Sequence, residues 1–156
     1  MFSIKKLAGV AAIAALALLA PMTAAAKPAA KQVAKEVQSQ ALGKTVLASL
    51  KGRTLYSLSV EKHGKFICTG TCTATWHPLL VPAATKPKGP VALGTVKRPE
   101  GKTQVTYKGR PLYTFAGDSK PGDVNGEGSE GFFAVGVDGK LIKSAPSPAA
   151  STMAGY

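Results

Sequence analysis

The sequence predicts an all-β protein, a small sandwich or partly open barrel built from two tandem β-hairpin repeats. An internal duplication is the first reason: residues 50–61 (LKGRTLYSLSVE) recur 57 positions later as residues 107–118 (YKGRPLYTFAGD). Short runs rich in β-branched and aromatic residues alternate with turn signals, and no stretch has a convincing amphipathic helix pattern. Because an isolated hairpin is marginally stable, we expect the two copies to cover each other's apolar faces about a rough two-fold axis.

The first 26 residues have the pattern of a cleaved secretory signal peptide. Lys5 and Lys6 precede an apolar run, which is too short to span a bilayer comfortably, and small residues occupy positions 24–26. We expect cleavage after Ala26, no transmembrane segment in the mature chain, and a periplasmic or secreted location.

Residues 27–44 and 144–156 flank the predicted repeats. The first segment is rich in Ala, Lys and Gln with few apolar residues, which predicts a solvated linker or one loose helix. The second is small, polar and contains proline, which predicts a disordered tail.

The first predicted repeat covers residues 45–81. Two strands flank the turn at Lys51–Arg53, and residues 79–81 are expected to enter the core after Trp76. Residues 82–102 contain several Pro and Lys residues, which predicts a connector between the copies.

The second predicted repeat covers residues 103–143. Its hairpin is followed by a Gly- and acid-rich loop at 117–131, and then by a hairpin whose Asp138-Gly139 pair is typical of a type I′ turn. The constant 57-residue offset also places Phe133 at the position equivalent to Trp76.

The chain is strongly basic, with a formal net charge of +12. Outside the cytoplasm such a charge favours anionic envelope components as partners, for example lipid headgroups or acidic polysaccharide. Specific nucleic-acid binding is not expected, because basic residues are not interleaved with stacking aromatics and no known module is present. The sequence does not predict an oligomeric state.

Cys68 and Cys72 are the two cysteines of the chain. An even pair in an oxidising compartment predicts a local disulfide. An alternative is a zinc or copper site that combines both thiols with His63 and His77, although Cys-x3-Cys is not a usual zinc spacing.

Tyr113, Phe115 and Asp118 form the pattern Tyr-x-Phe-x-x-Asp, and Tyr56 is the matching tyrosine of the first copy. In a strand Tyr113 and Phe115 point to one face, and Asp118 at the strand exit can accept backbone N–H bonds. A catalytic role for Asp118 would need a partner base or nucleophile, and no His lies near it in sequence. We therefore expect a structural role, no catalytic residues and no cofactor.

Half of the eight acidic residues lie in or at the edge of the Gly-rich loop. Asp123 and Glu127 are weak candidates for calcium ligands, because carboxylate oxygens on a flexible loop suit this ion. The twelfth position counted from Asp123 is Ala134, so the loop is not an EF-hand.

Residues 109–115 with Asp118, and residues 52–56 followed by the cysteine pair and Trp76, resemble a bacterial secreted or lipoprotein repeat of unknown function. Its members carry tandem copies of a Tyr-x-(Phe/Trp/Tyr)-x-x-Asp motif, and the resemblance extends over residues 45–143. The first copy departs from the motif at Leu58 and Glu61, and the lipobox cysteine of many members is absent. The resemblance implies no particular activity; a loose association with alkane utilisation is among its implications.

The sequence thus favours a soluble, non-enzymatic protein outside the inner membrane, of unknown biochemical role, that acts as a binding or interaction module. The alternative is an envelope metal-binding protein that uses the thiol and histidine residues or the acidic loop. A hydrolase or oxidoreductase is a weaker alternative.

Overall fold

The computed structural model describes residues 28–143, and the predicted signal peptide and tail lie outside this range. Short strands dominate the chain, and the two helices within the described range are α1 (Cys72–Thr75) and the 3₁₀ helix η1 (Ser129–Gly131). The strands are, in order, β1 Ala30–Gln32, β2 Ala34–Ser39, β3 Lys44–Ser49, β4 Tyr56–Leu58, β5 Trp76–Pro78, β6 Leu80–Val81, β7 Lys86–Lys88, β8 Leu93–Lys97, β9 Thr103–Tyr107, β10 Arg110–Pro111, β11 Tyr113–Phe115 and β12 Phe132–Ala134.

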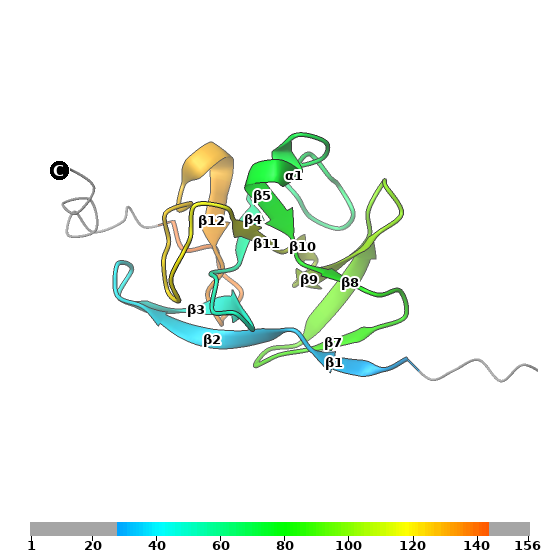
Figure 1. Cartoon of the computed structure of the whole chain (residues 1–156), viewed down its shortest axis with the longest axis horizontal. Coiled ribbons are helices and arrows are strands. Elements are labelled where there is room, and N and C mark those ends of the chain that lie inside the picture. The colour runs from blue at the N-terminus through cyan, green and yellow to red at the C-terminus, as the bar shows by residue number, and fades with distance from the viewer. Residues whose placement is uncertain (1–27, 144–156) are drawn as a thin grey trace, which may run out of the picture.

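These strands form small, mostly antiparallel sheets without a closed barrel, and the prediction of an all-β fold is confirmed (Figure 1). The central sheet has the order β12-β4-β11-β5. Strand β9 pairs with β10, β6 and β8, and β2 pairs with β3. One pairing, β1 with β7, is parallel.

The two copies are interlocked, because a later strand of each copy pairs with a strand of the other copy's hairpin region. Strand β12 of the second copy pairs with β4 of the first, and β5 of the first copy pairs with β11 of the second. Backbone bonds recur in the same way: the N–H of Val135 donates to Leu55 and the N–H of Leu79 donates to Leu112, both at 2.9 Å. These equivalences support the expected two-fold relation.

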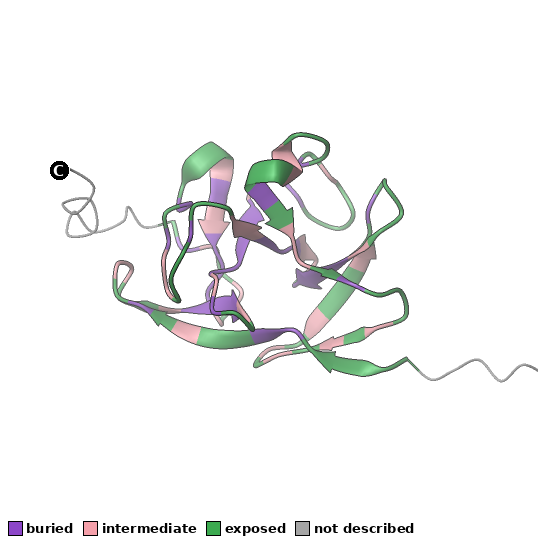
Figure 2. Cartoon of the chain, viewed as in Figure 1, coloured by how far each residue is buried: buried purple, intermediate pink, exposed green. Residues whose placement is uncertain are grey.

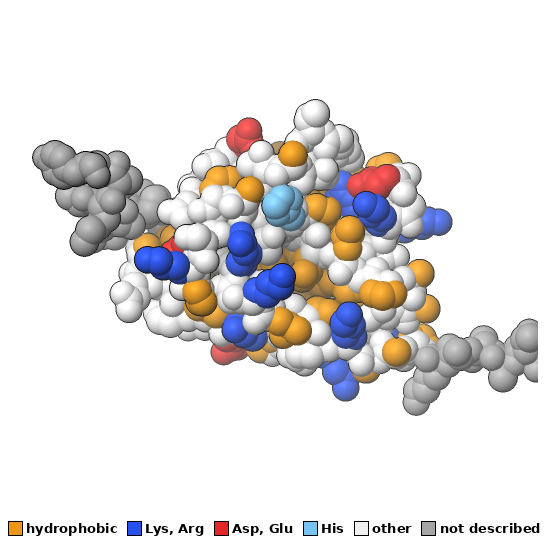
Figure 3. Space-filling view, viewed as in Figure 1, with side chains coloured by type: hydrophobic (Ala, Val, Ile, Leu, Met, Phe, Trp, Pro, Cys, Tyr) orange, Lys and Arg blue, Asp and Glu red, His pale blue; other side chains and the backbone are white. Residues whose placement is uncertain are grey.

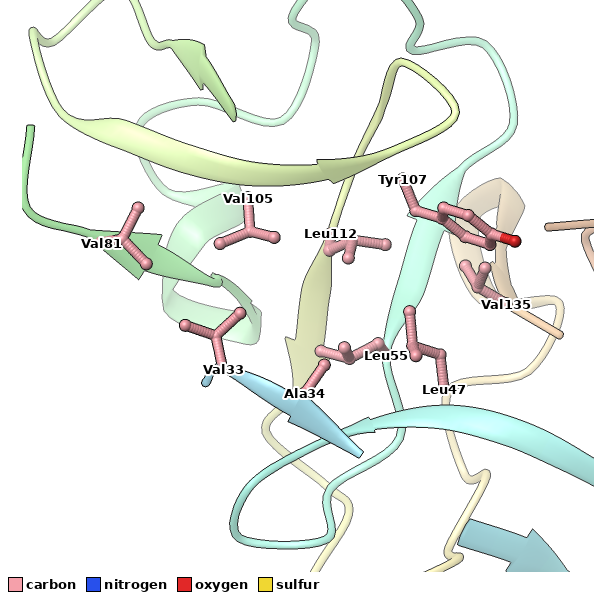
Figure 4. Packing of buried hydrophobic residues seen from close by; sticks show 9 residues of the cluster. All are labelled: Val33, Ala34, Leu47, Leu55, Val81, Val105, Tyr107, Leu112 and Val135. Atoms are coloured by element: carbon pink, nitrogen blue, oxygen red, sulfur yellow. The ribbon is translucent and has the colours of Figure 1, made fainter. Parts of the chain in front are cut away.

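Leu55 and Leu112, the matching leucines of the two hairpins, are fully buried in one apolar cluster. Figure 4 shows both side chains in this cluster, together with side chains from β2, β3, β6 and β9. A second cluster forms around Trp76, Tyr56 and Tyr113. Figure 2 shows the buried segments facing the inside of the molecule, with exposed residues on the turns and outer strands. Each copy therefore buries its apolar face against the other, as the duplication predicts.

The prediction of a linker over residues 27–44 is wrong for its central part. Strand β1 pairs with β7, and β2 pairs along its whole length with β3. Val33 and Ala34 are buried in the apolar cluster. The polar composition misled the prediction, because edge strands are held by backbone bonds and need few apolar side chains.

The predicted connector at residues 82–102 is also partly regular, since it contains β7 and β8. The last hairpin lies where it was predicted, with a bridge between Val135 and Leu141. Its turn is not type I′, because Gly139 has a φ of 79° while Asp138 does not adopt a positive φ. A type I′ turn needs a positive φ at both central residues; Lys108 and Gly109 meet this condition in the second repeat, with φ values of 48° and 75°.

Within residues 28–143, none of the helices combines the length and apolar character that crossing a membrane requires.

Candidate functional site

The two motif tyrosines lie at the centre of the molecule. Tyr56 on β4 and Tyr113 on β11 are directly opposite each other in an antiparallel pair, and both are fully buried. A buried phenol needs a partner for its hydroxyl group, because an unsatisfied polar group in an apolar core costs about 1–3 kcal/mol.

Each tyrosine finds that partner in the opposite copy. The hydroxyl of Tyr56 donates to Oδ2 of Asp118 at 2.8 Å, and the hydroxyl of Tyr113 donates to Oε2 of Glu61 at 2.7 Å. We call these two reciprocal bonds the cross-brace. The tyrosine and the acid of one copy therefore do not bond to each other. Instead, the tyrosine of each copy bonds to the acid of the other copy, which gives two symmetric contacts.

The second oxygen of each acid orders the loop that follows it. Oε1 of Glu61 accepts the N–H groups of Ile67 and Cys68 at 2.5 and 2.6 Å, and Oδ1 of Asp118 accepts the N–H of Asn125 at 3.0 Å. Cys68 and Asn125 occupy equivalent positions, each seven residues after the acid. The expected structural role of Asp118 at the strand exit agrees with this geometry.

The Glu61 side of the cross-brace also contains a buried cation, Arg98, that sequence reasoning missed. Its guanidinium donates to the Tyr113 hydroxyl at 3.2 Å and to the carbonyl of Cys68 at 2.8 Å. Further bonds go to Gln104 and Glu100, both at 2.5 Å. Arg98 thus connects the phenol, the disulfide loop and β9. An arginine in a polar connector gives no local signal of burial.

The Asp118 side has no such buried arginine. Burial raises the pKa of Asp118 to about 6, against the opposing effect of the Tyr56 hydroxyl bond. Burial also raises the pKa of Glu127 to about 7; its Oε2 accepts the N–H of Ala134, and its Oε1 has no hydrogen-bond partner. The pKa of Tyr56 and that of Tyr113 are raised by burial and by their carboxylate partners, so both phenols stay neutral donors.

Phe115, the aromatic residue of the motif, contacts Trp76 with ring centroids 4.7 Å apart. Trp76 stacks face to face on Phe132 at 3.8 Å and donates its Nε1 proton to Glu130. The predicted equivalence of Trp76 with Phe133 is wrong. Strand pairing places Trp76 opposite Phe115 and Phe132 opposite Leu58, so Phe132 is the counterpart and the second copy is one residue shorter here.

Cys68 and Cys72 form the predicted disulfide. Both thiols are consumed in this bond, so they cannot act as the thiolate ligands of the predicted alternative metal site. His77 lies exposed with Nε2 2.9 Å from the carbonyl of Ala74, and His63 is exposed beside the second hairpin turn.

The acidic loop separates its two candidate calcium ligands. Oδ2 of Asp123 accepts the N–H groups of Ser119 and Lys120 at 3.0 and 2.7 Å, so it closes a local turn. Glu127 points into the core toward Ala134. Across residues 28–143, no three His, Cys, Asp or Glu side chains come together in a group that could hold a metal ion.

A pocket of about 480 Å³ opens on the face where β1, the β3–β4 turn and strands β5 and β6 meet. Figure 3 shows this face hollowed, with apolar surface in the hollow and Lys and Arg side chains at its edges. We call it the basic pocket. It is lined by Lys31, Gln32, Val33, Ser49, Leu50, Lys51, Arg53, His77, Leu79, Leu80, Val81 and Thr114.

The cations of the basic pocket form no ion pair within the described residues, although Arg53 lies near enough to the Asp118 carboxyl to lower its pKa. The ion pairs found there are Arg98–Glu100 and Lys140–Asp138, which leaves Lys31, Lys51 and Arg53 without one. Arg53 is nevertheless held in place, because its Nη1 donates to the backbone carbonyl of Asp118 at 2.7 Å. This bond uses one of the five N–H donors of the guanidinium, so the other N–H groups can donate hydrogen bonds to a ligand.

The equivalent turn of the second copy is occupied. Lys108, the counterpart of Lys51, donates to the carbonyl of Asp138, and Arg110, the counterpart of Arg53, donates to Ser59. Tyr107 donates its hydroxyl proton to Val137 on the same final hairpin. The two arginines are therefore bonded in the same way, each to one backbone carbonyl of the other copy, and the copies differ in the lysine: Lys108 bonds to the final hairpin, whereas Lys51 lines the pocket. The sequence could not reveal this difference, because both copies have the same Lys-Gly-Arg turn.

Residues 94–135 match a family model described as a secreted repeat of unknown function. The matched segment runs from β8 to the residue after β12 and contains the motif residues Tyr113, Phe115 and Asp118. It confirms the resemblance for the second copy; residues 45–81 lie outside the match. No curated protein and no solved structure matched the chain.

Proposed function

We propose, from the premise that residues 94–135 carry a secreted repeat of unknown function, that this chain is a non-enzymatic binding module that works outside the cytoplasm. Its binding site is the basic pocket, and its ligand is a small anion. The observation that carries this proposal is the group of three cations, Lys31, Lys51 and Arg53, which line a concave surface and form no ion pair in the described part of the chain.

The motif itself supports a non-catalytic protein. Tyr56, Tyr113 and Asp118 are buried, with at most 1% of each exposed, and their polar atoms already bond to one another or to the backbone. A catalytic group must reach its substrate. The lining of the basic pocket contains one histidine, His77, and two hydroxyl side chains, Ser49 and Thr114, but no Cys, Asp or Glu that could complete a nucleophile or acid–base pair with them.

The test is an NMR titration of the mature chain with inorganic phosphate, acetate and hexanoate, each compared with an uncharged analogue. We expect saturable shifts of the backbone amides of Lys51 and residues 79–81 with at least one of these anions. The equivalent turn at Lys108 is the internal control and should not respond. Absence of any saturable response, or larger shifts at Lys108 than at Lys51, would refute the proposal.

A further inference from the structure

The basic pocket combines its charge with an unusually accessible apolar surface. Four large apolar side chains are markedly exposed within the described residues: Leu50, Val60, Ile67 and Leu80. Two of them, Leu50 at 49% and Leu80 at 39%, line the pocket. Leu79 and the buried residues Val33 and Val81 continue this surface inward. Apolar surface left open inside a concave site marks the position of an apolar ligand group.

The lining also excludes several ligand classes. It contains no Asp or Glu to balance a cation, and no Phe, Tyr or Trp; His77 supplies the one ring of the lining, a small surface for stacking a nucleobase. The volume of about 480 Å³ lies within the range of about 300–1,000 Å³ that is typical of small-molecule sites. A small ligand with one negative end and one apolar end would satisfy both parts of the lining.

We propose that the basic pocket binds a single-chain amphiphile with an anionic head, of the chemical class of a long-chain carboxylate. The head lies at Lys51 and Arg53, where the guanidinium is oriented by its bond to the backbone carbonyl of Asp118 and can donate two hydrogen bonds to a carboxylate. The chain lies against Leu79, Leu80 and Leu50. This assignment rests on the proposed function, because it names the ligand class of the same site.

The test measures the affinity of the mature chain for hexanoate, octanoate and dodecanoate by calorimetry, below the concentrations at which these compounds form micelles. Each added CH₂ that enters the pocket should tighten binding up to about 4-fold. Dodecanol, which keeps the chain and loses the charge, should bind at least about 5-fold more weakly than dodecanoate.

Two variants separate the contributions of head and chain. Lys51→Gln should weaken dodecanoate binding about 3-fold, in the range of an exposed ion pair, and Leu80→Ser should flatten the dependence of affinity on chain length. Lys97→Gln and Val60→Ser are the matched controls, because they remove an exposed cation and an exposed apolar side chain outside the pocket lining. Neither control should change the affinity.

The outcomes distinguish this inference from the proposed function. If phosphate and acetate bind at Lys51 but the affinity for carboxylates does not rise with chain length, the assignment of an amphiphilic ligand is wrong and the anion-binding function stands. If no anion binds at Lys51, the amphiphile assignment and the proposed anion-binding function are both refuted. Binding to vesicles that contain phosphatidylglycerol without binding of monomeric dodecanoate would also overturn the inference, since the ligand would then be a membrane surface.

Discussion

The two halves of the molecule use the same bonds in different electrostatic surroundings. In each half a carboxylate accepts a tyrosine hydroxyl from the other copy and the N–H groups of its own following loop. Glu61 is accompanied by the buried guanidinium of Arg98, which bonds to the same tyrosine. The arginine near Asp118 is the half-buried Arg53, which bonds to the Asp118 backbone carbonyl and not to Tyr56, and burial raises the pKa of Asp118 to about 6. The cross-brace therefore sets the architecture, and the accessory charges determine how each half responds to mutation and pH.

The largest effect is expected from Arg98→Met, which removes the cation from the Glu61 half. The substitution leaves Gln104, the Cys68 carbonyl and the Glu61–Tyr113 pair without their shared donor. Breaking such a buried charged network costs about 3–5 kcal/mol. Denaturant unfolding would measure this loss, with Lys97→Met as the control at an exposed neighbouring position; equal stabilities of the two variants would contradict the role of Arg98.

A smaller difference should separate the two tyrosines. Tyr113→Phe removes a hydroxyl that donates to Glu61 and accepts from Arg98, whereas the Tyr56 hydroxyl donates to Asp118 alone among side chains. Each deletion should cost about 1–3 kcal/mol, and Tyr113→Phe should cost more. Unfolding free energies of the two variants at one pH test the order, and a larger cost for Tyr56→Phe would reverse the comparison.

The Asp118 half should control the pH dependence of stability. Asp118 and Glu127 have pKa values of about 6 and about 7 when folded, against ordinary values of 3.8 and 4.5. A raised pKa means that the folded chain binds protons that the unfolded chain does not bind, so stability rises as pH falls from 8 to 5. We expect a gain of about 1–3 kcal/mol over this interval.

Glu127→Gln should reduce this gain, because a neutral side chain no longer takes up a proton. Glu100→Gln is the control: Arg98 lowers the pKa of Glu100, so this residue binds no additional proton on folding and does not contribute to the gain. Denaturant midpoints measured at pH 5, 6, 7 and 8 test the expectation. A stability that falls between pH 8 and pH 5 would contradict it.

The disulfide should contribute less than the Arg98 network. Cys68 and Cys72 close a loop of few residues, for which the chain-entropy model gives about 2 kcal/mol. The double variant Cys68→Ser/Cys72→Ser should therefore stay folded, since Glu61 still binds the N–H of residue 68 and Arg98 its carbonyl. Complete unfolding of the variant would show that the disulfide, rather than these bonds, orders the loop.

The duplication allowed the fold class and both hairpins around the Lys-Gly-Arg turns to be predicted from the sequence, and the disulfide was predicted from the single pair of cysteines. It could not reveal the interlocking, because a repeated sequence pattern does not specify whether β12 pairs within its own copy or with β4 of the other. The same limit applied to the site. Tyr56, Glu61, Tyr113 and Asp118 were recognised as equivalent, but their exchange of partners depends on tertiary pairing.

The basic pocket could not be predicted for another reason. Its lining comes from β1, the first hairpin turn, β5 and β6, which are far apart in sequence. Leu80 was expected in the core with Leu79 and Val81, and its 39% exposure results from the position of β6 at the edge of the pocket.

The most direct test of the cross-brace is a set of double-mutant cycles. Tyr56→Phe is combined with Asp118→Asn, and Tyr113→Phe is combined with Glu61→Gln; the comparison cycle combines Tyr113→Phe with Asp118→Asn from one motif. Coupling energies of about 1 kcal/mol are expected for the two pairs between copies, and less than about 0.5 kcal/mol within the motif. Stronger coupling of Tyr113 to Asp118 than to Glu61 would contradict the account.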